Sequence, residues 1–123
     1  MNRFTTYEKV AHCNPDGEIW LSEEFTSELI DNKRNSPEEM ENLRTILSIA
    51  EKFLQEGKPN HGLRLYEKVL QQTAFRAKEQ KELLPYAEQA LRGLSKLTSS
   101  EEEFIWEASS QLYGDYRRII ENR

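Results

Sequence analysis

The segment from Ser36 to Gln71 restricts most narrowly the folds open to this chain. Apolar residues recur at intervals of three and four over residues 40–54 and again over 63–74, which is the period of an amphipathic helix. Between the two patterns lie Gly57, which suits a helix end, and Pro59, which prevents the first helix from continuing. Two helices with so short a connection pack antiparallel through their apolar faces. We therefore expect a helical hairpin here.

Signals at the helix ends support this interpretation. Ser36, Pro37 and Glu39 have the spacing of a capping box, with serine at the N-cap, proline at the first helical position and glutamate at the third. Ser100 and Glu103 have the same serine-to-glutamate spacing and predict the start of the last helix. The apolar stripe of the helix after Ser36 is predicted to contain Met40, Leu43, Leu47, Ala50 and Leu54, widened by Ile46, Ile49 and Phe53.

Most of the remaining chain also has helical patterning. We expect a short helix over residues 22–32, a helix over 61–80, a break near 82–85, a helix over 85–97 and a last helix from 101 almost to 123. A single helix kinked at Pro85 is the alternative to the break. The predicted fold is all-α: an antiparallel bundle of four to five helices in one domain, residues 1–123.

Residues 1–21 form an N-terminal extension for which two structures compete. Pro15, Asp16 and Gly17 suit a tight turn between two β-compatible segments, which predicts a short β-hairpin over about residues 7–21. The alternative is a first helix that begins at Thr5 and stops at Asn14, before the proline. The turn residues favour the hairpin, and the helix stays open as an alternative.

Composition restricts the environment and the partners of the chain. The 123 residues carry a net charge of −5. When the chain is divided into residues 1–35, 36–74, 75–100 and 101–123, only the segment 75–100 has more basic than acidic groups, five against three. A nucleic-acid-binding surface normally needs a concentrated basic face. No apolar run approaches the roughly 20 residues of a membrane span. The single cysteine fits a reducing compartment, so we expect a cytoplasmic protein that binds proteins and no membrane.

Residues with catalytic or metal-binding chemistry are scarce. His12, Cys13 and His61 are the only histidines and cysteine, and they lack the paired spacing of a zinc site. The acidic runs after Ser36 and Ser100 lie at predicted helix starts, where carboxylates already have a favourable electrostatic role. No glycine-rich phosphate loop or nucleophile motif is present. We predict no enzymatic activity, no catalytic residue, no metal and no cofactor.

Residues 43 to about 76 resemble one tetratricopeptide repeat, a 34-residue pair of antiparallel helices. The residues that carry the resemblance are Phe53 before the turn glycine Gly57, the small residue Gly62, the aromatic Tyr66, and the pair Val69 and Leu70. Ile46, Ile49 and Ala50 occupy further family positions. No second copy of this pattern lies 34 residues upstream or downstream. The resemblance implies a scaffold that holds a partner peptide or helix in a groove, without catalysis.

We therefore interpret the chain as a non-catalytic protein–protein interaction module, adaptor or small regulatory protein, with a homodimer among its predicted partners. The predicted partner contacts are the exposed members of an aromatic set plus one arginine: Phe53, Tyr66, Tyr86, Trp106, Tyr113, Tyr116 and Arg117. The alternative is a nucleic-acid-associated regulator that uses the cations of 75–81 and 117–118, which are Arg76, Lys78, Lys81, Arg117 and Arg118.

Overall fold

The computed structural model describes residues 11–13, 19–21 and 36–121. Four helices account for most of them, as the all-α prediction requires: α3 (Glu39–Gln55), α4 (Pro59–Thr73), α5 (Leu84–Leu97) and α6 (Glu103–Glu121). Two 3-10 turns, η2 (Arg76–Lys78) and η3 (Lys81–Leu83), connect α4 to α5.

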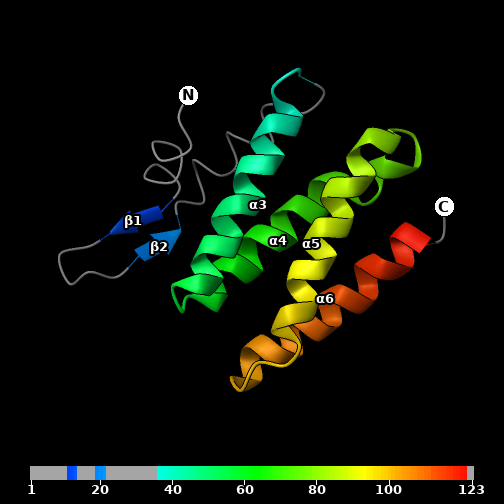
Figure 1. Ribbon diagram of the computed structural model, residues 1–123. Helices are drawn as coiled ribbons and strands as arrows, with labels where there is room; N and C mark the ends of the chain where they lie inside the picture. The colour runs from blue at the N-terminus through cyan, green and yellow to red at the C-terminus, as the bar shows by residue number, and fades with distance from the viewer. Residues whose placement is uncertain (1–10, 14–18, 22–35, 122–123) are drawn as a thin grey trace.

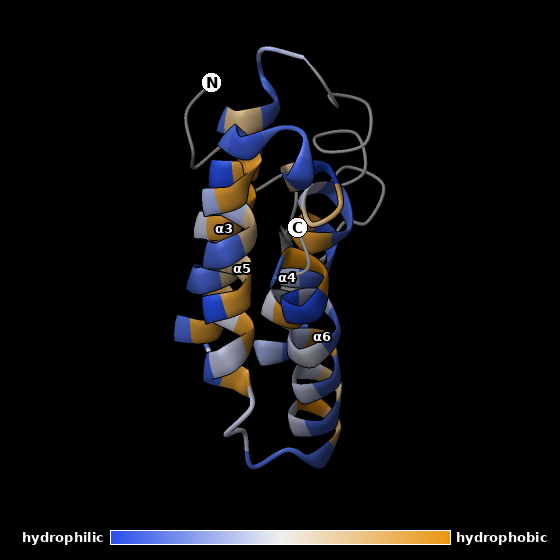
Figure 2. Cartoon of the chain, turned by 90° about the vertical axis from the view of Figure 1, so that its right-hand side faces the viewer, coloured by the Kyte–Doolittle hydropathy of each residue, from blue (hydrophilic) through white to orange (hydrophobic). Residues whose placement is uncertain are grey.

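The four helices lie in two layers. Each helix packs against the next one in the chain, and contacts also join α3 to α5 and α4 to α6 (Figure 1). In the view of Figure 2, α3 and α5 form one layer and α4 and α6 form the other. The core between them contains Leu43, Ile46, Leu47, Ala50, Phe53, Leu65, Val69, Leu70, Ala87, Ala90, Leu94 and Ile105.

The turn between α3 and α4 forms as its residues predict. Gly57 has a φ of 74°, a left-handed conformation that glycine adopts without steric cost. The Lys58 N–H donates to the Phe53 carbonyl at 2.8 Å, and the Gly57 N–H donates to the Leu54 carbonyl at 3.2 Å. These two bonds are those of a Schellman motif, which satisfies carbonyls at the end of a helix. Pro59 then begins α4, where its missing N–H costs nothing.

Two glycines allow the helices to approach closely. A Cβ at Gly62 would lie 3.1 Å from the Ala50 carbonyl oxygen of α3 and 2.9 Å from a Leu54 methyl. A Cβ at Gly93 would overlap the Tyr66 ring, so the ring of α4 occupies the space left by the missing side chain on α5. Burial raises the pKa of Tyr66 to about 12, with a smaller contribution from the Glu51 carboxylate. The small residues therefore set the spacing between successive helices.

The capping box predicted at the start of α3 is wrong. The cap position belongs to Glu38, which makes no side-chain capping bond, and Glu39 is buried. Both carboxylate oxygens of Glu39 accept bonds from the Arg76 guanidinium, at 2.7 and 2.9 Å. Arg76 also donates to the Gln80 side chain at 2.9 Å. This bidentate, charge-assisted pair joins the first turn of α3 to the η2 turn.

The helix predicted over residues 61–80 ends earlier, at Thr73. Its polar continuation forms η2 and η3, whose backbone is held by bonds such as Gln80 N–H to the Arg76 carbonyl at 2.8 Å. Arg76 therefore pairs with Glu39 from the η2 turn and not from α4. The predicted break is confirmed, with Pro85 in the first turn of α5, and the alternative of one kinked helix is wrong.

The start of α6 agrees in part with the capping box predicted from Ser100 and Glu103. The Ser100 hydroxyl accepts a hydrogen bond from the Glu102 N–H at 3.2 Å, and the helix begins at Glu103. Farther along, the buried Ser109 hydroxyl donates to the Ile105 carbonyl at 2.6 Å. This bond within the helix satisfies a polar group that the core would otherwise leave without a partner.

Two short strands precede the helices. β1 (Ala11–Cys13) pairs antiparallel with β2 (Ile19–Leu21), and His12 lies opposite Trp20 in the register. The turn predicted at residues 14–17 and the helix predicted over 22–32 lie outside the described residues.

Candidate binding groove between α4 and α6

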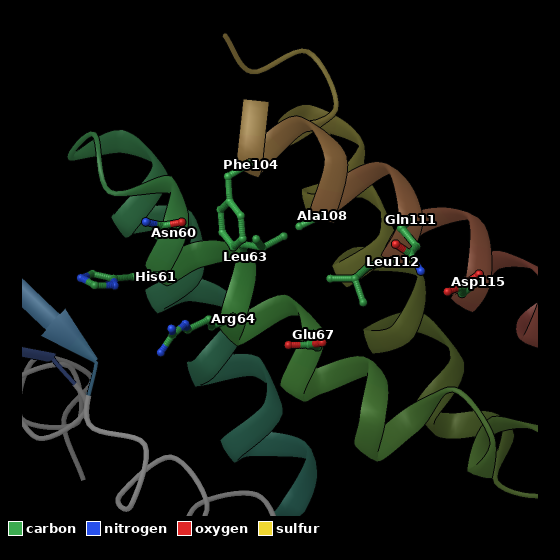
Figure 3. A pocket seen from close by; sticks show the side chains of 10 residues that line it. All are labelled: Asn60, His61, Leu63, Arg64, Glu67, Phe104, Ala108, Gln111, Leu112 and Asp115. Carbon is green, nitrogen blue, oxygen red and sulfur yellow. The ribbon is translucent and has the colours of Figure 1, made fainter. Parts of the chain in front are cut away.

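A groove of about 480 Å³ lies between α4 and α6, the two helices of the second layer. The close view in Figure 3 shows side chains from both helices along it. Its lining residues are Asn60, His61, Leu63, Arg64 and Glu67 of α4, and Phe104, Ala108, Gln111, Leu112 and Asp115 of α6.

Helical spacing separates an apolar floor from a polar rim. Phe104, Ala108 and Leu112 follow one another at intervals of four residues, so they form one line along α6. Leu63 of α4 faces this line and is almost fully buried. Polar side chains, among them Gln111, lie along both edges. An apolar floor with a polar rim is the arrangement found in protein interfaces.

Phe104 is the most exposed large hydrophobic residue of the described chain, with 68% of its surface accessible. It lies at the start of α6, immediately after the acidic turn that begins the helix. Its ring borders the groove beside Leu63 (Figure 3). Phe104 differs from the other exposed aromatic residues of the described chain, Phe75 and Trp106, because it alone of the three lines the groove.

The charges of the groove are unevenly distributed. The first turns of α4 contribute His61 and Arg64, whereas Glu67 and Asp115 lie at the other end, beside Tyr116. Burial raises the pKa of Tyr116, and the carboxylates of Glu67 and Asp115 add to the effect because they disfavour a phenolate beside them. One end of the groove is therefore an acidic site next to a half-buried phenol.

His61 lines the groove near Arg64 and also contacts the core residue Phe53. Its ring meets the Phe53 ring edge-on, with 5.0 Å between centroids and 72° between planes. Edge-to-face pairs of this kind are favourable because the positive edge of one ring meets the negative face of the other. The position of His61 is therefore set by α3 as well as by α4.

Two of the predicted partner contacts are core residues. Phe53 is 0% exposed and Tyr66 is 4% exposed, and both lie between the helices. Their prediction as contact residues is corrected here, because a side chain buried in the core offers no surface to a partner. Their aromatic size serves packing: Tyr66 fills the space over Gly93, and Phe53 meets His61.

Of the other predicted contacts, Tyr113 and Arg117 lie together on α6, whereas Tyr86 lies on α5. Tyr86 is half-buried on α5 and its hydroxyl lies 3.5 Å from the Arg44 guanidinium of α3. Tyr113 borders a small hollow of about 200 Å³ with residues of α5. The Arg117 guanidinium lies 5.8 Å from the Tyr113 ring centroid and donates to Glu121 at 2.8 Å. Tyr116 lies half-buried beside the acidic end of the groove.

Trp106 is 48% exposed but does not line the groove. It follows Phe104 by two residues, which places the two side chains about 200° apart around the helix. Sequence reasoning singled out Trp106 and missed Phe104, Leu63, Ala108 and Leu112. The available signal was the four-residue spacing of Phe104, Ala108 and Leu112, which places them on one line of the helix.

Among the residues that the structure describes, no group of three or more histidine, cysteine, aspartate or glutamate side chains is arranged to hold a metal ion. None of the helices α3 to α6 has both the length and the apolar character needed to cross a bilayer. His12 and Cys13 lie on β1, where the structure gives the pairing register alone.

No protein-family model, curated protein or solved structure matches this chain.

Proposed function

We propose that this protein is a non-catalytic interaction module that holds a segment of another protein in the α4–α6 groove. The observation that carries the proposal is the 68% exposure of Phe104 at the edge of an apolar floor made by Leu63, Ala108 and Leu112. Covering these side chains would remove apolar surface from water, at roughly 25 cal/mol per Å². The polar rim would set the orientation of the bound segment.

The arrangement of the helices supports a repeat-like scaffold. In a tetratricopeptide array, equivalent helices lie side by side in two layers, and α3–α4 and α5–α6 would correspond to two hairpins. We propose that residues 39–73 form one repeat-like hairpin and that α5 and α6 supply the second, which covers the face that a single unit leaves exposed. The ten residues from Ala74 to Leu83 would then be an insertion between the two units.

The charges of the described residues favour a protein partner over nucleic acid. Two of the five cations proposed for phosphate contacts are engaged in ion pairs, Arg76 with Glu39 and Arg117 with Glu121. The groove itself contains two carboxylates, which would repel a phosphate backbone. Nucleic-acid binding stays the alternative, and it requires an affinity that falls steeply as salt rises.

The test is capture of partners from the native cell by the full-length chain and two variants. Ala108→Arg places a long charged side chain in the middle of the groove floor. Trp106→Ala is the matched control, because it removes an exposed aromatic two residues away that does not line the groove. We expect Ala108→Arg to lower the recovery of a specific partner at least about tenfold, which corresponds to about 1.4 kcal/mol, and Trp106→Ala to leave it unchanged.

Thermal unfolding of the three proteins provides the control for folding. The proposal fails if Ala108→Arg remains folded and recovers the same partners as the unchanged protein. A second copy of the chain is among the partners to be scored, because a homodimer through this groove would be disrupted by the same variant.

A further inference from the structure

The two carboxylates at the acidic end of the groove indicate the charge of the residue that binds there. Glu67 comes from α4 and Asp115 from α6, so the two helices present one carboxylate each at the same end. Both carboxylates help to raise the pKa of Tyr116, the residue that follows Asp115 on α6. A bound segment therefore meets a carboxylate from each of the two helices at this end of the groove.

We propose that the occupant is an amphipathic helix that places a lysine or arginine side chain between Glu67 and Asp115. This inference rests on the proposed function, and it specifies the chemistry and orientation of the bound segment. A cation at this position would face one carboxylate from each wall of the groove.

The shape and length of the floor favour a helix over an extended strand. Phe104 and Asp115 are separated by eleven residues of α6, or about 16 Å at 1.5 Å per residue. This length corresponds to about three helical turns, enough for apolar anchors at i, i+4 and i+7. An extended strand would place its own N–H and C=O groups over Leu63, Ala108 and Leu112, whose apolar side chains offer them no hydrogen-bond partner. A helix satisfies these groups internally.

Ala108 has a particular role in this arrangement. It lies between Phe104 and Leu112 on α6, so the middle of the floor is lower than its two ends. A large side chain of the partner can enter there, between the two longer residues. The groove therefore selects a segment with one large apolar residue at its centre and a basic residue about one turn farther along.

The test uses a pair of synthetic helical peptides of about 14 residues, four turns long. Both have the same leucine stripe and acetylated and amidated ends. One carries two lysines near one end, and the other has glutamines in their place. Binding to the full chain is measured at low salt by NMR shifts of the α4 and α6 amides, and again with Asp115→Lys, a change at an exposed position.

We expect the lysine peptide to shift the groove residues and to bind the unchanged protein about three- to fivefold more tightly than the glutamine peptide. This range is that of exposed charge pairs, up to about 1 kcal/mol. Asp115→Lys should abolish or reverse the difference, and added salt should reduce it.

The outcomes separate this inference from the proposed function. Equal binding of both peptides to the groove, or tighter binding of the glutamine peptide, overturns the basic-residue inference and leaves the groove as a binding site. Shifts confined to residues outside α4 and α6, or no shifts with either peptide, overturn both. A charge preference that persists in a folded Asp115→Lys protein places the cation elsewhere and also overturns the inference.

Discussion

At the scale of single residues, glycines determine how closely the helices of this protein approach one another. Gly57 ends α3 with a left-handed backbone, and Gly62 and Gly93 leave space that neighbouring helices fill. Gly114 differs, because a Cβ added there would meet nothing within 4 Å. Gly93 and Gly114 therefore offer a matched pair for measuring what close approach contributes to stability.

We expect Gly93→Ala to destabilise the fold by about 1–3 kcal/mol, because the new methyl group overlaps the Tyr66 ring and forces a shift in a packed core. Gly114→Ala should be neutral or stabilising by up to about 1 kcal/mol, since alanine is the better helix former and has room. Urea unfolding of the two variants measures both. Equal stability of the two variants would contradict the close packing of Tyr66 on Gly93.

At the scale of elements, the Glu39–Arg76 ion pair joins the first turn of α3 to the turn that follows α4. Its side chains are only 5% and 20% exposed, whereas those of the Glu41–Arg44 pair on α3 are 62% and 56% exposed. Removal of one partner from a buried pair leaves an uncompensated charge, which costs much more than loss of an exposed pair.

Arg76→Ala should therefore lower the free energy of unfolding by about 2–4 kcal/mol, because the Glu39 carboxylate loses both of its bonds to Arg76. Arg44→Ala, the control at the exposed pair, should cost no more than about 0.5 kcal/mol. Chemical denaturation gives both values. A small and equal effect of the two substitutions would show that the Glu39–Arg76 pair does not hold the two elements together.

The sequence predicts these elements well where the signals are local. The end of α3 depends on Gly57 and Pro59, which are adjacent to it, and the start of α5 depends on Pro85. The ion pair of Glu39 is not visible in such local signals, because its partner Arg76 is 37 residues away in the chain. The helical pattern likewise does not show that α4 ends at Thr73.

At the scale of the whole molecule, the groove could not be predicted from the sequence. It lies between α4 and α6, helices that are not consecutive, and helical periodicity does not say which apolar face meets which neighbour. Phe104 and Trp106 are both aromatic and both exposed, yet only Phe104 lines the groove.

The central claim is that partners bind in the α4–α6 groove, and site-specific photo-crosslinking in the native cell tests it most directly. A benzophenone amino acid replaces Phe104 in one full-length protein and Trp106 in another, so that two exposed aromatic positions of the same helix are compared. We predict a discrete adduct with a partner protein from position 104 and none from position 106. Adducts from position 106 alone, equal adducts from both positions, or none from position 104 would contradict this account.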